Sequence, residues 1–155
     1  LGATYQMPSD DRSSHGEDYL RARITGALGG RAAEQLIYGV VTTGAENDLQ
    51  QVTEIARRMV LRWGMSAKLG PISFVAAADE GLPPAFQHQP YSEATSELID
   101  NEVRRIVEEC HGEADRLLAE HRPKLESLAR ALLERESLDE QEVRAAAGLS
   151  VRREA

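Results

Sequence analysis

Asp48 is the residue whose type and position first suggest metal chemistry in this sequence. It lies in the first turn of a helix expected over about 47–63, and the apolar residues at +4, +7 and +11 are Val52, Ile55 and Met59. This spacing directs the carboxylate along the buried stripe of the helix rather than into open water. Two roles are open on spacing alone. The carboxylate can bind a metal, or it can accept hydrogen bonds from free backbone N–H groups and offset the helix dipole.

Glu34 is the second acidic candidate. It follows the glycine-rich step Gly29-Gly30-Arg31 inside an expected helix. Because Gly30 lies one turn earlier and has no side chain, another group has room to approach the Glu34 carboxylate. The alternative is an ordinary i, i+3 ion pair with Arg31 on the helix surface.

The other residues that could do chemistry form no complete catalytic pattern. No two of the four histidines are spaced i, i+4, which would place both imidazoles on one helical face. Glu108 and His111 form one E-x-x-H step, whereas a di-iron bundle needs two such steps and two further carboxylates, so a solvated face is favoured. Cys110 falls on an apolar stripe and is interpreted as a small core residue. The sequence contains neither a G-x-x-x-x-G-K-[ST] phosphate loop nor a G-x-S-x-G nucleophile elbow.

Composition narrows the class of protein. The chain has 155 residues, enough for one domain with a sizeable core, and 41% of them are hydrophobic. Its 18 Lys and Arg against 26 Asp and Glu give a net charge of −8, which argues against a nucleic-acid partner because such binding rests on clustered cations. No apolar run approaches the ~18 residues of a membrane span. The single cysteine cannot form an internal disulfide, so we expect a soluble cytoplasmic chain.

Two amphipathic helices near the N-terminus must position Asp48 and Glu34. The first is expected from about Glu17, with a capping box that begins at Ser14, to about Tyr38. Three glycines in its interior predict either close packing against another backbone or a kink, since each costs roughly 1 kcal/mol relative to Ala. The second helix ends at Gly64, and its predicted buried face consists of Leu49, Val52, Ala56, Met59 and Trp63.

The last third of the chain is also expected to be helical. Ser92 can cap a helix to about Glu120, Pro123 interrupts, and a further helix follows. A second capping box, beginning at Ser137, predicts a short helix to about Gly148. The apolar positions of the long helix repeat at heptad-like spacing and are Ile99, Val103, Ile106, Cys110, Ala114 and Leu117.

Strands are expected in two short segments, Leu1 to Met7 and Ile72 to Ala76. The predicted fold class is therefore mainly α, with minor strand content near the N-terminus. Residues 1–155 are interpreted as a single domain, with a frayed charged tail over 150–155.

Several motifs together resemble one known family. Residues 28–34 read L-G-G-R-A-A-E, residues 41–49 read V-T-T-G-A-E-N-D-L, and residues 63–66 read W-G-M-S. They resemble the protease domain of FtsH-type ATP-dependent zinc metalloproteases of the AAA+ class. The resemblance extends over nearly the whole chain, and it implies a helical FtsH-like peptidase domain.

The resemblance also implies a site and an assembly. Such enzymes are membrane-anchored homo-hexamers whose ATPase ring uses ATP to feed protein substrates into a proteolytic chamber on the cytoplasmic side of the membrane. Their catalytic Zn²⁺ is held by the two histidines of an H-E-x-x-H helix and by one aspartate, which maps onto Asp48. Glu34 maps onto an acidic residue that supports the site without binding the metal. The family's substrate-binding strand corresponds to Gly2, Ala3, Thr4 and Tyr5.

The sequence departs from the family at one decisive point, because it contains no H-E-x-x-H. In the family this motif lies upstream of the position of Leu1, so we expect the chain to be the C-terminal portion of a peptidase domain. It would then lack the catalytic residues, the ATPase module and the membrane segments, make no direct membrane contact and be inactive alone. The alternative is a non-catalytic FtsH-like scaffold or adaptor that acts through helix–helix association.

Overall fold

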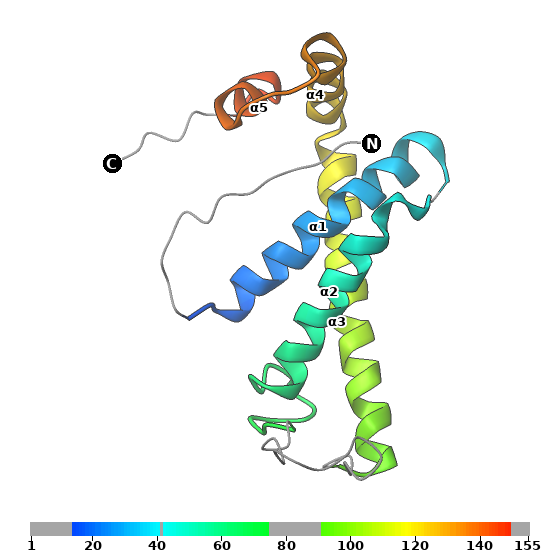
Figure 1. Ribbon diagram of the computed structural model, residues 1–155, viewed down its shortest axis with the longest axis vertical. Helices are drawn as coiled ribbons and strands as arrows, with labels where there is room; N and C mark the ends of the chain where they lie inside the picture. Colours follow the sequence, from blue (N-terminus) through cyan, green and yellow to red (C-terminus); the bar gives the residue numbers. More distant parts are fainter. Residues whose placement is uncertain (1–13, 41, 75–90, 150–155) are drawn as a thin grey trace, which may run out of the picture.

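The computed structural model describes residues 14–40, 42–74 and 91–149. In these ranges the chain forms five α-helices and one short 3-10 helix and no strand (Figure 1). The mainly α fold class is confirmed. Residues 72–74, expected at the start of a strand, are irregular; 75–76 and the other expected strand, Leu1–Met7, lie outside the described residues. No helix of the described ranges is long and apolar enough to cross a bilayer.

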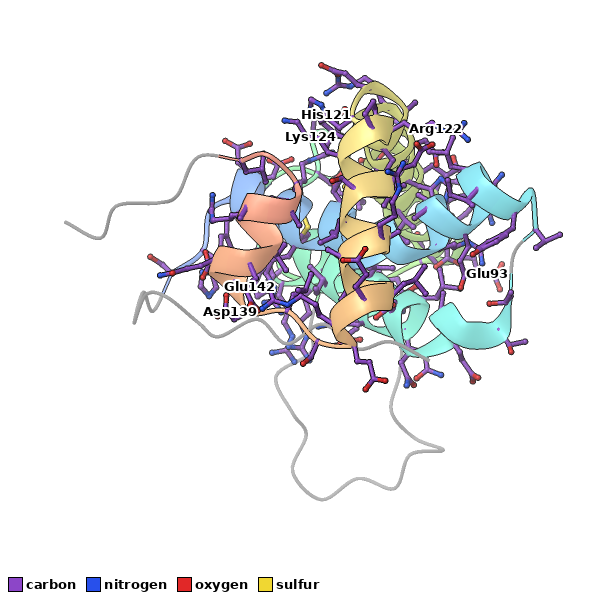
Figure 2. All side chains as sticks on the ribbon, turned by 90° about the horizontal axis from the view of Figure 1, so that it is seen from above. Glu93, His121, Arg122, Lys124, Asp139 and Glu142 are labelled. Atoms are coloured by element: carbon purple, nitrogen blue, oxygen red, sulfur yellow. The ribbon has the colours of Figure 1, made fainter. Side chains whose placement is uncertain are left out.

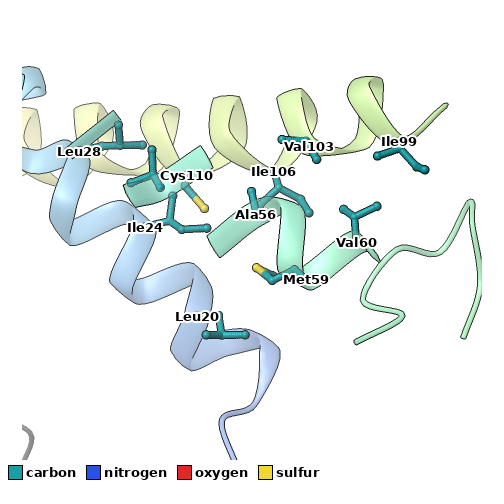
Figure 3. Packing of buried hydrophobic residues seen from close by; sticks show 11 residues of the cluster. Leu20, Ile24, Leu28, Ala56, Met59, Val60, Ile99, Val103, Ile106 and Cys110 are labelled. Atoms are coloured by element: carbon teal, nitrogen blue, oxygen red, sulfur yellow. The ribbon is translucent and has the colours of Figure 1, made fainter. Parts of the chain in front are cut away.

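Three helices build the core: α1 (Glu17–Tyr38), α2 (Glu46–Leu61) and α3 (Glu93–Glu120), each packed against the other two. Their apolar stripes meet in one cluster, which Figure 3 shows between the helices. Each fully buried Leu, Ile or Met side chain contributes roughly 1.5–3 kcal/mol relative to exposure. The cluster consists of Leu20, Ile24, Leu28, Val52, Ala56, Met59, Val60, Ile99, Val103, Ile106 and Cys110.

The predicted buried face of α2 is confirmed in its centre and wrong at its end. Val52, Ala56 and Met59 are fully buried, but Trp63 remains 48% exposed. The reason is that α2 ends at Leu61 and the chain turns away at Gly64, which has a φ of 61°. A Cβ at Gly64 would lie 2.8 Å from the Cα of Pro71, so glycine is required by both conformation and space.

The helix starts are close to those predicted, but two of the predicted caps are wrong. Gly16 is the N-cap of α1 and makes no side-chain hydrogen bond, so the box at Ser14 is not formed. The capping box of α5 (Glu140–Ala146) is made by Asp139 and Glu142, labelled in Figure 2, two residues beyond the predicted pair. Asp and Ser are comparable N-caps, so the sequence offered two competing starts.

The cap predicted for α3 is confirmed, because the Ser92 hydroxyl accepts a hydrogen bond from the Thr95 amide at 3.3 Å. The glycine-rich part of α1 does not behave as expected. The helix runs through Gly26, Gly29 and Gly30 without a break, and a Cβ added at any of them would meet nothing within 4 Å in the described structure. The close packing predicted for these glycines is therefore not found in the described ranges.

The last two helices form an arm that stands apart from the core. α4 (Arg122–Arg135) packs on α5 and on the end of α3, and within the described residues neither α4 nor α5 reaches α1 or α2 (Figure 1). No residue of either helix is buried, and Leu133 is 84% exposed. Pro123 lies in the first turn of α4, where its missing N–H costs nothing, so it begins the new helix.

Candidate functional site

Asp48 lies in the first turn of α2, as predicted, and it is half-buried. The residues that continue its stripe are in the core (Val52 and Met59) or packed against it (Ile55), so the packing of α2 fixes the backbone that carries the carboxylate. The N-cap of α2 is Ala45, which makes no side-chain cap. Within the described ranges the Asp48 carboxylate forms no hydrogen bond and no ion pair. It is therefore available to a ligand.

Glu34 is joined to the segment that opens α2. The Thr42 hydroxyl donates a hydrogen bond to Glu34 Oε2 at 3.0 Å and accepts one from the Gly44 amide at 3.2 Å. Thr42 is also the N-cap of the 3-10 helix η1 (Thr43–Ala45), which continues directly into α2. The structure thus gives Glu34 a partner outside its own helix, in place of the surface pair with Arg31 that the sequence left open.

Thr42 was missed by reasoning from the sequence. The available signal was local: a threonine two residues before a glycine, just ahead of a helix, is typical of a side chain that bonds a nearby backbone N–H. Its link to Glu34 joins two helices across a loop, and such a contact leaves no periodic trace in the sequence.

The donor set around Asp48 suits one metal ligand and not a complete site. A catalytic zinc site uses three protein ligands. In the described part of the chain no group of three or more His, Cys, Asp or Glu side chains is arranged to hold a metal. A half-buried carboxylate that has no partner among the described residues is a suitable oxygen donor for Zn²⁺, so Asp48 fits as one ligand and two more would have to come from elsewhere. The predicted substrate segment, Gly2 to Tyr5, lies outside the described residues.

Two open hollows flank the N-terminal half of α2, and neither is lined by Asp48 or Glu34. The larger, about 600 Å³, follows η1 and one side of α2 from Thr42 to Glu54. The smaller, about 370 Å³, lies between α1, α2 and α3 and includes Glu108 and His111. Here His111 Nδ1 pairs with Asp115 Oδ2 at 3.1 Å, across one helical turn. His111 of the E-x-x-H step therefore has a local partner on its own helix.

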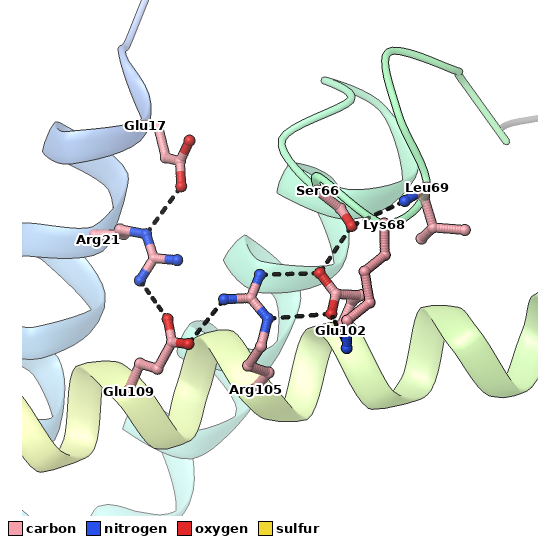
Figure 4. A network of polar contacts seen from close by, with 8 residues as sticks. All are labelled: Glu17, Arg21, Ser66, Lys68, Leu69, Glu102, Arg105 and Glu109. Carbon is pink, nitrogen blue, oxygen red and sulfur yellow. Dashed lines mark hydrogen bonds and ion pairs between the residues drawn. The ribbon is translucent and has the colours of Figure 1, made fainter.

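A second carboxylate, Glu102 on α3, has the opposite surroundings. Its side chain is 1% exposed, and both oxygens are occupied (Figure 4). Oε2 accepts from Ser66 Oγ at 2.8 Å and from Arg105 Nη2 at 2.9 Å. Oε1 accepts from Arg105 Nε at 3.1 Å and pairs with Lys68 Nζ at 3.2 Å. The bidentate contact with Arg105 lowers the pKa of Glu102 from 4.5 to about 2, although burial alone would raise it.

This cluster continues to α1 through alternating charges. Arg105 also donates a hydrogen bond to Glu109. Arg21 of α1 donates hydrogen bonds to both Glu109 and Glu17 (Figure 4). No buried side-chain polar atom of the described residues lacks a hydrogen-bond partner. This cluster could not be predicted from the sequence, because Glu102 occupies a position on the edge of the apolar stripe of α3. With all its lone pairs engaged, Glu102 serves to hold the fold and not to bind a substrate.

Comparisons with known proteins agree on one family. A model of the family described as Peptidase family M41 matches residues 1–146. The chain is 55% identical over 151 residues to a protein of Thermobaculum terrenum called ATP-dependent zinc metalloprotease FtsH, and this match covers 96% of the chain and 23% of the relative. Proteins of Syntrophus aciditrophicus and Conexibacter woesei, named ATP-dependent zinc metalloprotease FtsH and FtsH 3, are 51% and 49% identical over 96% of the chain. The chain spans about a fifth of the length of these relatives.

Proposed function

This chain belongs to peptidase family M41, and on that premise we propose that it forms the C-terminal portion of an FtsH-type peptidase domain. The whole protein would be an ATP-dependent zinc metalloendopeptidase that degrades membrane and unfolded cytoplasmic proteins. The chain contributes Asp48 as the third zinc ligand, and the two histidines come from an H-E-x-x-H helix in polypeptide that precedes Leu1. The observation that carries this proposal is the half-buried Asp48 carboxylate, which has no partner among the described residues.

Each part of the chain has a defined task in this mechanism. Bound zinc supplies a Lewis acid that polarises the peptide carbonyl and lowers the pKa of a bound water. Asp48 contributes an anionic oxygen donor, and the burial of Val52 and Met59 keeps the helix that carries it in place. The segment around Gly2 to Tyr5 offers main-chain groups to an extended substrate, a mode that accepts many sequences. Because one carboxylate does not bind zinc tightly, the chain is inactive by itself.

The partners follow from the same proposal. The substrates are proteins, ATP is used by an ATPase module outside this chain, and six copies assemble on the cytoplasmic side of the membrane. The arm formed by α4 and α5 supports a part in that assembly, because it leaves Leu132 and Leu133 of α4 exposed, and Leu149, which follows α5, is exposed as well. A non-catalytic scaffold acting through helix–helix association is the alternative that this exposed arm favours.

The test compares this chain with a version extended upstream to include the paired histidines. We expect the extended protein to bind one zinc per chain and to cleave unfolded casein, and the 155-residue chain to do neither. Asp48→Asn in the extended protein keeps the size of the side chain and should weaken zinc binding by on the order of a hundredfold or more, beyond the effect typical of supporting residues.

Glu46→Gln is the matched control, because Glu46 is an exposed carboxylate of the same helical turn. It should leave zinc affinity within about twofold. Stoichiometric zinc in the short chain, or full zinc affinity and cleavage in the Asp48→Asn protein, would refute the proposal. If the upstream reading frame encodes no H-E-x-x-H, the scaffold alternative holds instead.

A further inference from the structure

Among the described residues, the Thr42 hydroxyl joins α1 to the start of α2 through two hydrogen bonds. It donates to the Glu34 carboxylate on α1 and accepts from the backbone amide of Gly44 in η1. η1 has three residues and passes without interruption into α2, so Asp48 follows Gly44 by four residues in continuous helical structure. A shift at Gly44 is therefore transmitted to the first turn of α2 and to its carboxylate.

The Thr42 hydroxyl packs closely against the backbone at Gly44. A Cβ added at Gly44 would lie 3.3 Å from Thr42 Oγ1 and 4.0 Å from Glu34 Oε1. The Cβ–Oγ1 distance is tighter than ordinary van der Waals contact, so a side chain at position 44 would require the Thr42 hydroxyl to shift slightly. Glycine at this position keeps the Thr42 hydroxyl between the carboxylate and the amide.

The contact has little to do with holding the fold together. Thr42 is exposed and Glu34 is only half-buried, whereas the burial of Ala45 already anchors η1 to the core. An exposed hydrogen bond contributes modestly to folding because water replaces it. The same hydrogen bond can still matter for a metal site, because the orientation of a metal ligand depends on the groups that hold it in place.

We propose that Thr42 is a positioning residue for the metal site: its hydroxyl holds η1 against Glu34 and so sets the direction of the Asp48 carboxylate. The inference rests on the proposed role of Asp48 as a zinc ligand. Thr42 itself touches neither metal nor substrate in this account, and Glu34 acts through it as the fixed point on α1.

The experiment uses the upstream-extended protein with three variants. Thr42→Val keeps the shape and removes the hydroxyl, Thr42→Ser keeps the hydroxyl, and Thr43→Val removes the hydroxyl of the exposed neighbouring residue as a matched control. We expect Thr42→Val to weaken zinc affinity roughly tenfold, the lower end of the effect for groups that orient a ligand. Thr42→Ser and Thr43→Val should both stay within about twofold of the unchanged protein.

A second measurement reports on the contact without the metal. Hydrogen exchange of the Gly44 amide in the metal-free protein should accelerate in Thr42→Val and stay slow in Thr42→Ser and Thr43→Val. Unchanged zinc affinity in Thr42→Val overturns the inference, as does weakened affinity with unchanged Gly44 exchange. If Asp48→Asn leaves zinc binding intact, the proposed function fails instead, so the two failures are distinguishable.

Discussion

The two ends of α2 use the same chemical arrangement in different surroundings. After its C-terminus, the Ser66 hydroxyl donates to Glu102 at 2.8 Å and accepts from the Leu69 amide at 3.3 Å. Before its N-terminus, the Thr42 hydroxyl donates to Glu34 and accepts from the Gly44 amide. In both cases one hydroxyl joins a carboxylate on a neighbouring helix to the backbone of a turn. Ser66 and Glu102 are 4% and 1% exposed, whereas Thr42 is exposed.

Burial decides what each arrangement can do. A buried carboxylate must have its oxygens paired, because an uncompensated charge away from water is costly. Glu102 meets this requirement through Arg105 and Lys68, and it has no oxygen left for chemistry. The opposite end is open to water, so Asp48 can remain without a partner in the described structure and still be tolerated. A stabilising carboxylate, Glu102 of α3, is thus bonded to the segment that follows α2, whereas Asp48, which has no partner among the described residues, lies in the first turn of α2.

The largest expected effect is on stability at the buried end. Glu102→Ala removes the acceptor of the Ser66 hydroxyl and two hydrogen bonds of Arg105, which keeps its bond to Glu109. We expect a loss of about 3 kcal/mol in the free energy of unfolding. Asp48→Ala should change it by less than about 0.5 kcal/mol, as is usual where no contact is lost. Urea unfolding of the 155-residue chain measures both. Glu97→Ala, an exposed carboxylate on the same helix as Glu102, is the control. Equal losses at Glu102 and Asp48 would contradict the comparison.

The next prediction concerns acid. Because the folded state lowers the pKa of Glu102 from 4.5 to about 2, the unfolded chain binds more protons between these values. The stability that Glu102 contributes is therefore complete above about pH 4.5 and is lost as the pH falls toward 2. Glu109, whose pKa Arg105 also lowers, acts in the same direction. In urea unfolding from pH 5 to pH 3, the difference in the free energy of unfolding between the unchanged chain and Glu102→Gln should shrink. A difference that stays constant over this range would contradict the prediction.

Much of the fold could be predicted because it follows from periodic burial. The stripes through Val52 and Ile106 repeat at helical spacing, so the helices and their buried faces could be found from the sequence. The caps at Ser14 and Ser137 were wrong because helix starts depend on local competition between similar residues. The prediction that Trp63 is buried was wrong because α2 ends before this residue.

Only part of the candidate site could be predicted from the sequence, because only part of it depends on helix periodicity. The position of Asp48 in a first turn follows from the sequence, and its identity as a candidate ligand came from resemblance to a family. The ligand role itself stays a prediction, as do Glu34 as a supporting group and the substrate segment at Gly2 to Tyr5. The contacts of Thr42 with Glu34 and of Ser66 with Glu102 could not be found, because these hydrogen bonds join segments that are distant in sequence or separated by a turn.

The smallest expected change in stability tests whether buried contacts or an exposed ion pair stabilise the C-terminal end of α2. Lys68 contacts Glu102 at 3.2 Å, but its side chain is 61% exposed, so water and salt screen the pair. Lys68→Gln should therefore cost less than about 0.5 kcal/mol in urea unfolding, and that cost should shrink further at high salt. Arg105 and Ser66 still satisfy Glu102 in this variant, which is why the loss stays small. If Lys68→Gln lowered the free energy of unfolding as much as Glu102→Ala, an exposed ion pair would stabilise this end of α2 as strongly as the buried contacts do. Burial would then no longer explain the difference between the two ends of α2.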